Sequence, residues 1–460
     1  MSFSSYGSYK DTNVAELGEV PAHWNVAPLK HVVETPITDG PHETPEFIDD
    51  GIPFVSAEAV SSGEINFSKS RFISHADHHR YSKKYKPRRN DIFMVKSGAT
   101  TGVVALVSTD RDFNIWSPLA VVRCSRLAFP RYVLQAMRSR NFQESVILNW
   151  SFGTQQNIGM SVIENLRIPL PPKPEQTQIA RFLDHETARI DALIEEQQRL
   201  IELLKEKRQA VISHAVTKGL DPSVPMKDSG VEWLGEVPVH WSFKQSKYLL
   251  EFVTSGSRGW AEYYSDDGEL FFRIANLTRD SIEPKLLSIQ YVTPPKNAEG
   301  ERSKVRCGDI LISITADLGS VCVANNEVAG SYVSQHVALA RPIKMTAFSR
   351  WLAYFVLSNA CKEQLVGAGY GGTKVQLSLD DIRSFWVSVP PYEEQILIAA
   401  FLDREIQAFD GLIAQATIGM GLLSERRSAL ISAAVTGKID VRGWQPPASA
   451  QAPVLERETV

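Results

Sequence analysis

Apolar and polar residues follow two different patterns along the chain. Short apolar runs bounded by Gly and Asp predict strands at 51–55, 91–95, 102–107, 119–122, 270–274, 309–314 and 332–340. Longer stretches with helical spacing predict helices at 131–148 and 349–366. This mixture predicts α+β domains with mainly antiparallel or mixed sheets.

Two much longer helical stretches each follow a Pro-Pro pair. The first, 175–217, contains neither Gly nor Pro. Four of its residues recur at a spacing of seven: Ile190, Gln197, Leu204 and Val211. The second, 393–436, has counterparts in the matching places: Phe409, Ala416, Leu423 and Leu430. A seven-residue repeat predicts coiled-coil packing, and ~40 residues at ~1.5 Å each form a rod of about 60 Å.

The second long helix also carries three glycines, Gly411, Gly419 and Gly421. Each costs about 1 kcal/mol relative to Ala in a helix. We expect them either to let the helix lie close to a partner helix or to kink it locally.

The chain also repeats itself. The motif L-G-E-V-P-x-H-W occurs at 17–24 and 234–241, and segment 208–217 returns at 427–436. Two copies of this size predict a pseudo-symmetric molecule in which each copy buries its own core. Segment 227–234, which follows the first long helix, matches segment 10–17, which precedes the first domain. In a two-fold arrangement the second long helix must therefore end near the start of the first domain. It can do so only by running antiparallel to the first long helix. Between these shared elements, segments 56–85 and 275–300 hardly align. Such divergence is expected if the two copies recognise different sequences.

These patterns predict five segments. They are a first domain with its N-terminal segment at 1–174, a first spacer helix at 175–218, a second domain at 219–392, a second spacer helix at 393–437 and a disordered tail at 438–460.

Composition narrows the functional classes. The four cysteines are scattered without a C-x-x-C pair, which argues against a disulfide scaffold and a zinc site. No apolar run approaches the ~18 residues of a membrane span, and the N-terminus lacks a signal-peptide pattern, so we expect a cytoplasmic protein with no membrane partner. The net charge of −4 gives no global bias toward nucleic acid, so any such interaction must be local.

Several strings resemble catalytic motifs only in part. G-A-G-Y-G-G at 367–372 follows a helical pattern rather than a strand. H-E-T-A-R at 185–189 has Arg where a zinc motif needs its second His, and V-P-P-Y at 389–392 has Val where adenine methyltransferases need Asn or Asp. His75, His78 and His79 lack nearby Cys or a carboxylate pattern, so we expect a surface loop there. The sequence predicts no catalytic and no metal-binding residues.

Basic residues gather in one stretch of each copy, where they could neutralise DNA phosphates. The first stretch offers five candidate DNA contacts: Lys83, Lys84, Lys86, Arg88 and Arg89. The second offers three: Arg302, Lys304 and Arg306. We call these two stretches the basic slots, because Asn90-Asp91-Ile92 follows the first as Gly308-Asp309-Ile310 follows the second. A solvated charged surface is the alternative for either slot alone.

A polar segment before each long helix supplies further candidates. G-T-Q-Q-N at 153–157 and G-T-K-V-Q at 372–376 occupy matching places. The side chains that could contact base edges are Gln155, Gln156, Asn157, Lys374 and Gln376. The alternative is a polar loop that caps the sheet.

Taken together, these linked motifs resemble the specificity subunit of type I restriction-modification systems. The resemblance rests on the two G-E-V-P-x-H-W motifs, D-G-P-H at 39–42, and P-P-x-x-E-Q with I-A-x-F-L-D at 171–184 and 390–403. In D-G-P-H, Pro41 stands where the family often has Thr. The second copy has T-S-G-S-R at 254–258 instead, and its Arg258 is a further candidate DNA contact.

The resemblance implies two pseudo-symmetric α/β target recognition domains joined by two long antiparallel coiled-coil helices. Each domain would bind one half of a split site in double-stranded DNA, with helix length setting the spacer. The implied partners are two modification subunits and restriction subunits. S-adenosylmethionine, ATP and Mg²⁺ would be bound by these partners and no cofactor by this chain, so the adenine-N6 methylation and DNA cleavage of the complex would not be its own.

Two other functions remain open. A self-contained methyltransferase-nuclease is disfavoured, because the chain lacks a cofactor loop after a strand. A coiled-coil adaptor that joins two protein partners without reading DNA is disfavoured by the matching basic slots.

Overall fold

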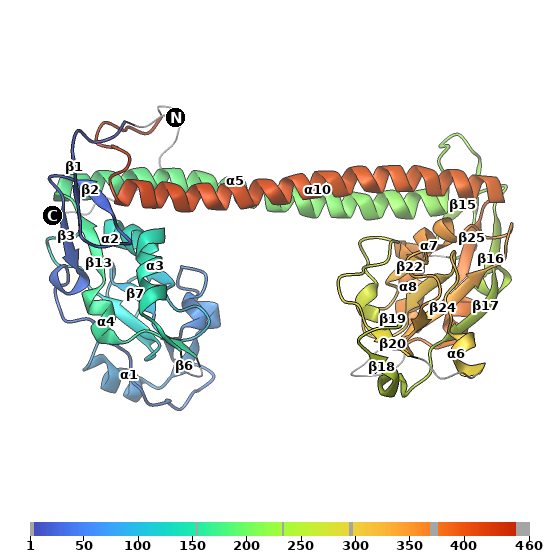
Figure 1. The fold of residues 1–460 in the computed structure, drawn as a ribbon, viewed down its shortest axis with the longest axis horizontal. Helices are drawn as coiled ribbons and strands as arrows, with labels where there is room; N and C mark the ends of the chain where they lie inside the picture. Colours follow the sequence, from blue (N-terminus) through green and yellow to red (C-terminus); the bar gives the residue numbers. More distant parts are fainter. Residues whose placement is uncertain (1–3, 153–154, 232–233, 294–297, 369–375, 448–460) are drawn as a thin grey trace. The chain divides into compact units, whose positions relative to one another are not determined.

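The computed structural model describes residues 4–152, 155–231, 234–293, 298–368 and 376–447 (Figure 1). They form two compact units: the described residues within 1–197 and 418–460 (unit 1), and those within 198–417 (unit 2). Each long helix, α5 (Lys173–Lys218) and α10 (Tyr392–Val435), therefore contributes one part to each unit. We call the parts of the units outside these two helices the first and second domains.

The first domain is built on two sheets. The larger has the order β4 (Thr38–Asp39), β10 (Leu119–Val122), β7 (Ile92–Val95), β8 (Val104–Leu106) and is antiparallel. The smaller has the order β6 (Arg71–Ile73), β5 (Ile52–Val55), β9 (Asn114–Ile115), with β5 and β9 parallel. Both faces of the larger sheet are covered, because Ile92 and Met94 join one buried cluster while Phe93 and Val95 join another.

The second domain repeats this plan. Its larger sheet has the order β17 (Leu250–Ser255), β24 (Val337–Pro342), β21 (Ile310–Ser313), β22 (Val321–Val323). Its smaller sheet has the order β18 (Tyr264–Ser265), β20 (Tyr291–Val292), β19 (Glu269–Phe272), β23 (Tyr332–Val333), and β19 and β23 are again parallel. The larger sheets thus share one strand order and both smaller sheets contain a parallel pair, which confirms the predicted duplication, although the smaller sheets have three and four strands.

Short antiparallel pairs complete each copy. In unit 1 they are β1 (Tyr9–Asp11) with β2 (Glu19–Pro21), β3 (Asn25–Pro28) with β13 (Arg167–Leu170), and β11 (Ser151–Phe152) with β12 (Gln156–Asn157). In unit 2 they are β14 (Met226–Asp228) with β15 (Glu236–Pro238), and β16 (Ser242–Gln245) with β25 (Trp386–Val389). The pairs β3–β13 and β16–β25 join the third strand of each domain to its last.

Each predicted domain helix is two helices, which corrects the single spans expected at 131–148 and 349–366. The pairs are α2 (Pro130–Arg138) with α3 (Arg140–Asn149), and α7 (Ser349–Leu357) with α8 (Asn359–Ala368). The break falls on Ser139 and on Ser358, both in extended conformation. Each serine hydroxyl also accepts a backbone N–H of the following helix, from Phe142 and Cys361 respectively, which offsets the interruption.

The remaining helices are short. The α-helices are α1 (His75–Ser82), α4 (Met160–Asn165), α6 (Ala298–Arg302) and α9 (Leu379–Ser384). The 3₁₀ turns are η1 (Leu29–His31), η2 (Glu58–Val60), η3 (Phe67–Lys69), η4 (Ser246–Tyr248), η5 (Trp260–Tyr263) and η6 (Ile274–Asn276).

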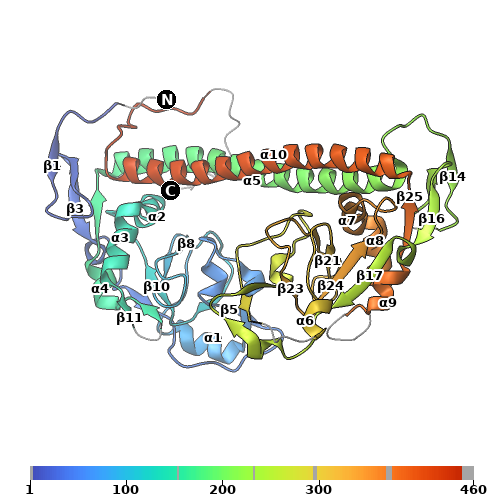
Figure 2. The same cartoon turned by 45° about the vertical axis from the view of Figure 1, so that its right-hand side comes forward.

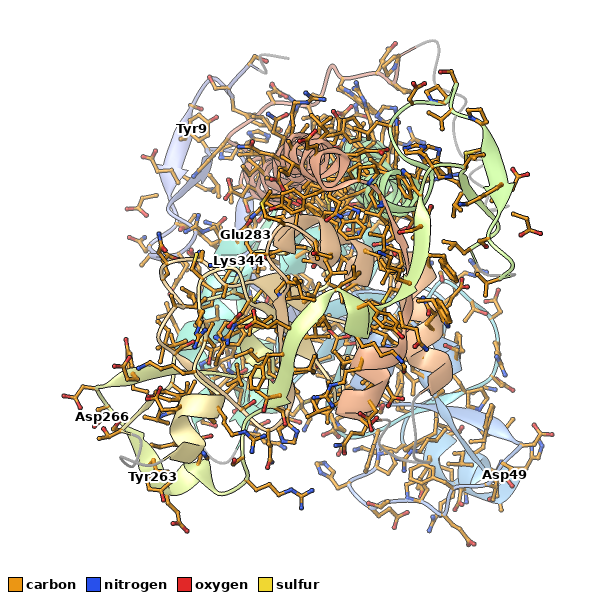
Figure 3. The ribbon with its side chains drawn as sticks, turned by 90° about the vertical axis from the view of Figure 1, so that its right-hand side faces the viewer. Tyr9, Asp49, Tyr263, Asp266, Glu283 and Lys344 are labelled. Atoms are coloured by element: carbon orange, nitrogen blue, oxygen red, sulfur yellow. The ribbon has the colours of Figure 1, made fainter. Side chains whose placement is uncertain are left out.

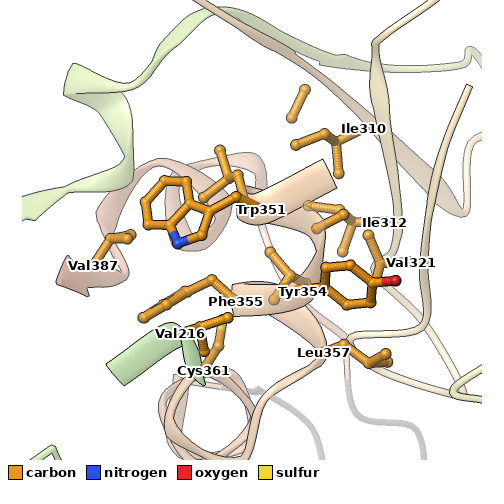
Figure 4. Close-up of a cluster of buried hydrophobic side chains, with 14 of the residues drawn as sticks. Val216, Ile310, Ile312, Val321, Trp351, Tyr354, Phe355, Leu357, Cys361 and Val387 are labelled. Carbon is orange, nitrogen blue, oxygen red and sulfur yellow. The ribbon is translucent and has the colours of Figure 1, made fainter. Parts of the chain in front are cut away.

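The core of unit 2 joins α7, the larger sheet and the end of α5 (Figure 4). Every residue of α7 from Trp351 to Leu357 is buried. Trp351 and Phe355 share a buried cluster with Ile310 and Ile312, and Val216 brings α5 into the same cluster. The end of one long helix is thus part of the core of the second domain.

Within each unit the two long helices are antiparallel, as predicted (Figure 2). In unit 1, Phe182 near the start of α5 shares a buried cluster with Val435 at the end of α10, and Asp191 pairs with Arg427 at 2.7 Å. In unit 2, Val216 near the end of α5 shares a cluster with Ile398 near the start of α10. At ~1.5 Å per residue, helices of 46 and 44 residues are about 69 and 66 Å long.

The seven-residue repeat marks the less exposed side of each helix. Ile190, Phe409 and Ala416 are buried, and the other five members of the repeat are half-buried. The flanking Leu193 and Leu200 are 39% and 43% exposed. By length and composition α10 would also pass for a membrane span, with a mean hydropathy of 1.3 in its most apolar window. Its two ends, however, pack into the cores of the two units.

Residues 438–444 are ordered, which corrects the prediction of a disordered tail from residue 438 onward. Val441 is buried, and Trp444 packs edge-on against Phe182 with the rings 5.3 Å apart. Gln178 Nε2 donates hydrogen bonds to the carbonyl oxygens of Val441 and Trp444. The segment is rich in polar residues, so its sequence did not predict that Val441 and Trp444 would pack against the long helix. The rest of the predicted tail, from 448, lies outside the described residues.

The glycines of α10 do not provide close helix approach, which corrects the first of the two explanations considered for them. A Cβ atom added at Gly411, Gly419 or Gly421 would meet nothing within 4 Å.

We therefore predict that Gly411→Ala, Gly419→Ala and Gly421→Ala each raise the free energy of unfolding by about 0.5–1 kcal/mol, because Ala loses less backbone entropy in a helix. Chemical denaturation measures the change. Gly437→Ala is the opposite control, since Gly437 has φ +72° and its Cβ would lie 2.4 Å from Pro21. A loss of stability in the three helical variants would contradict this interpretation.

Candidate nucleic-acid interface

Each G-E-V-P-x-H-W motif ends on a buried tryptophan at the joint between a domain and a long helix. Trp24 is 0% exposed, and its Nε1 donates to Glu175 Oε2 at 3.0 Å. His23 Nε2 lies 2.7 Å from the other oxygen of Glu175. In unit 2, Trp241 Nε1 donates in the same way to Glu394 at 3.1 Å. The motif therefore serves the attachment of domain to helix.

The glutamine after each glutamate completes the joint. Gln176 Oε1 accepts the backbone N–H of Phe129 at 2.7 Å, and Gln395 Oε1 accepts that of Phe348 at 2.8 Å. In the sequence, the P-P-x-x-E-Q motif supports the family resemblance but does not predict that its glutamine binds the backbone of the domain. The signal was present, because both members of each contact recur in both copies.

A buried ion pair stands at the end of each basic slot. Arg123 binds Asp91 with both Nε and Nη2 at 2.7 Å, and Arg341 binds Asp309 in the same way at 2.7 Å. Each aspartate also accepts a backbone N–H from the slot, that of Arg88 or that of Arg306, at 2.8 Å. The prediction that the two basic stretches occupy one structural place is therefore confirmed.

The first basic slot is partly neutralised by the protein itself. Lys86 pairs with Asp112 at 2.7 Å and Arg89 with Asp110 at 2.9 Å, both on the surface. Surface pairs contribute only ~0–1 kcal/mol, so a phosphate can compete for these cations. Lys83 and Arg88 are exposed, and neither side chain forms an ion pair within the part of the chain that the structure describes.

Lys84 has a structural partner. Its Nζ lies 2.6 Å from Asp39 Oδ1, and Lys96 lies 2.9 Å from Asp39 Oδ2. Burial alone would raise the pKa of the Asp39 carboxyl, but the hydrogen bonds from the two lysines outweigh it and lower the pKa. We therefore assign Lys84 first to this cluster; whether it also contacts DNA stays a prediction.

The second basic slot is more open. Arg302 and Arg306 are exposed, whereas Lys304 is half-buried and lies 5.8 Å from the ring centre of Tyr332. Arg258 is also exposed, on the turn that follows Gly256. Gly256 matches Gly40, because a Cβ on either would lie within 2.1 Å of a carbonyl oxygen, that of Val333 or that of Ile115.

The polar segments also occupy matching places. Asn157 bridges to Ser97, and Gln376 bridges to Thr315. Gln155, Asn157 and Gln376 are exposed, whereas Gln156 is half-buried. Lys374 lies outside the described residues. A role of these side chains in base contact stays a prediction.

The histidine cluster lies on a helix rather than the expected loop. His75, His78 and His79 belong to α1, whose first turn is capped by the Ser74 hydroxyl. His78 Nδ1 lies 2.6 Å from Asn114 Oδ1, so it has a structural partner. Among the described residues, no group of three His, Cys, Asp or Glu side chains could hold a metal ion, and all four cysteines are free.

The Asp39 cluster predicts a pH dependence of stability. A carboxyl whose pKa is lower in the folded than in the unfolded protein stabilises the fold above its unfolded pKa of ~4. This contribution is lost as the pH falls through the folded value. We expect Asp39→Asn to destabilise the protein at pH 7, and the difference from wild type to shrink as the pH falls from 5 to 2 in denaturation experiments. A difference independent of pH would contradict this account.

Comparisons with known proteins agree with this geometry. The family model described as the type I restriction modification DNA specificity domain matches residues 21–204 and 289–416. The MjaX specificity subunit of Methanocaldococcus jannaschii is 25% identical over 94% of this chain and 98% of its own length. The type I restriction enzyme EcoKI specificity subunit of Escherichia coli K12 is 21% identical over 93% of this chain and 91% of its own.

Two solved structures share the fold. A chain of a type I restriction-modification system superposes with a TM-score of 0.68, at 18% identity over 90% of this chain and 98% of its own. The HsdS subunit of Thermoanaerobacter tengcongensis gives a TM-score of 0.50, at 19% identity over 91% and 98%. With the family model covering more than half of its residues, this chain belongs to the DNA specificity subunits of type I restriction-modification systems.

Proposed function

We propose that this chain is the non-catalytic subunit that selects the DNA sequence for a type I restriction-modification complex. Each domain reads one half of a bipartite site, and the helix pair sets the spacer between the halves. Two modification subunits and the restriction subunits bind S-adenosylmethionine, ATP and Mg²⁺ and perform methylation and cleavage.

One observation carries this proposal: the two domains share a frame but differ in content. The joint glutamates, the buried Asp–Arg pairs and the strand order recur in both copies. Beside this frame, Asp39, which pairs with Lys84, precedes Gly40 in the first domain, whereas Ser255 precedes the matching Gly256 in the second, followed by exposed Arg258. A shared frame with different exposed side chains is what two readers of different half-sites require.

The exposed apolar residues of the long helices support partner docking. In unit 1 they include Leu193, Ile418 and Leu422, and in unit 2 Leu200, Leu203, Leu397 and Leu412. Unit 2 also has a cavity of about 400 Å³ lined by Val211, His214, Leu220 and Phe401. Phe182, the counterpart of Phe401, is covered by Trp444 in unit 1. We assign this open groove in unit 2 to a modification subunit.

The same apolar surface would suit a coiled-coil adaptor that binds two proteins without reading DNA. DNA binding separates the two functions. The adaptor predicts no sequence preference in the assembled complex and no effect of charge in the basic slots.

The charge test uses the two slot cations without an ion pair, Lys83 and Arg88. We expect the double variant Lys83→Glu with Arg88→Glu to weaken DNA binding by the complex with its modification subunits. The negative slope of log affinity against log salt should become shallower by about 1.8, because each of the two lost phosphate contacts contributes ~0.9 to its magnitude. The methylated sequence should stay the same, since phosphate contacts carry no base identity.

Lys30→Glu is the matched control. Lys30 is an exposed lysine outside the basic slot, and its Nζ donates a hydrogen bond to Asn165. It should leave both affinity and salt slope near those of wild type. If the slot variant behaves like this control, the assignment of the basic slot to DNA is wrong.

A further inference from the structure

The second domain contains a cavity of about 300 Å³ between its smaller sheet and the segment that follows Gly256. Aromatic side chains form one wall: Trp260, Tyr264 and Phe271. Arg273, Ser334 and Gln335 supply polar groups to the same cavity. Figure 3 places Tyr263 and Asp266, which flank Tyr264, at the tip of the second domain. We call this cavity the Trp260 pocket.

The Trp260 pocket gathers buried polar atoms that have no hydrogen-bond partner. Among the described residues, seven buried side-chain atoms lack one, and three of them belong to residues that line this pocket: Arg273 Nε, Ser334 Oγ and Gln335 Oε1. Buried polar groups are nearly always paired, and an unpaired one costs ~1–3 kcal/mol. Three such atoms at one cavity indicate a site whose partner is a ligand.

The polar side chains are held in place by their remaining atoms. Arg273 Nη2 donates to the Ser288 hydroxyl at 3.3 Å, and Gln335 Nε2 lies 3.0 Å from His336 Nε2. Trp260 and Phe271 stack with an interplanar angle of 11°. The pocket therefore has a flat aromatic wall beside a donor and an acceptor that are already oriented.

The first domain fills the equivalent place in a different way. Its cavity measures about 80 Å³ and lies beside Gly40, the counterpart of Gly256. Asp39 and Lys84 line it and bind each other. The surrounding frame is common to both domains, but the cavity of the second domain is larger, about 300 Å³ against about 80 Å³.

The Trp260 pocket adjoins the second basic slot. Tyr332 packs against Trp260 with ring centres 5.2 Å apart, and Lys304 of the slot lies over the Tyr332 ring. A ligand that reaches the pocket would thus place a neighbouring phosphate near a cation. Flat shape, hydrogen-bonding edges and an adjoining phosphate together describe a nucleotide in DNA.

We propose that the Trp260 pocket binds one base of the half-site read by the second domain, and that Arg273 and Gln335 select this base. Arg and Gln are the side chains that pair with guanine and adenine edges through two hydrogen bonds. Tyr264, 44% exposed at the pocket mouth, offers a ring against which the base can stack. This inference rests on the proposed function and names the selecting residues within it.

The test maps methylated sequences produced by the complex of this chain with its modification subunits. Gln335→Ala and Arg273→Lys should each reduce discrimination at a position of one half-site by about 5- to 150-fold, the range found for such base contacts. The other half-site should be unchanged. Gln290→Ala is the matched control, because Gln290 lies beside β20, outside the pocket lining, and donates to the Tyr291 carbonyl. It should methylate the wild-type sequence.

The outcomes separate the two proposals. If the wild-type complex shows a bipartite sequence and both pocket variants methylate it as Gln290→Ala does, the pocket assignment is overturned while the proposed function stands. If the wild-type complex shows no sequence preference, both fail. If either variant does not fold, Tyr264→Ala, a change at a partly exposed position, is measured instead. Weaker methylation that depends on the sequence of one half-site only supports the pocket. Unchanged methylation overturns it.

Discussion

One carboxylate at the start of each long helix holds a domain in place, and the rest of the molecule depends on this contact. Glu175 accepts the indole N–H of buried Trp24, and Glu394 does the same for Trp241. Without its acceptor, a buried indole N–H would cost ~1–3 kcal/mol. The same tryptophans also meet the ends of the opposite helices, because Cβ atoms at Gly437 and Gly219 would lie 3.1 and 3.3 Å from Trp24 and Trp241. Each tryptophan thus ties the start of one helix to the end of the other.

This joint explains why recognition can vary while the architecture does not. The duplicated motifs hold the domain on the helices, and the Asp91–Arg123 and Asp309–Arg341 pairs fix the end of each basic slot. The surfaces beside them are free to differ: one domain has a closed cluster of Asp39 and lysines, the other an open aromatic pocket. We infer that the first set of residues maintains the fold, which leaves the neighbouring surfaces to carry the differences between the two domains.

Much of this architecture could be predicted from the sequence, because its main motifs occur in two copies. The repeats predicted two similar domains, the heptads predicted the helix pair, and N-D-I and G-D-I aligned the basic slots. The serine breaks at Ser139 and Ser358 were missed, since the apolar pattern continues across them. The order of residues 438–444 was missed because Val441 and Trp444 stand isolated in a polar segment. The Trp260 pocket could not be found, because it joins Arg273 and Gln335, which are distant in the sequence and share no motif.

The proposed function requires that one pair of helices carries two domains, each of which reads its own half-site. The most direct test inserts seven residues of coiled-coil sequence into each helix, after Gln197 in α5 and after Thr417 in α10. Two helical turns add about 10.5 Å, or ~3 base pairs at ~3.4 Å each. Mapping the methylated sites of the resulting complex should give both original half-sites with a spacer longer by about three base pairs. Altered half-sites, or original half-sites at the original spacing, would contradict the account.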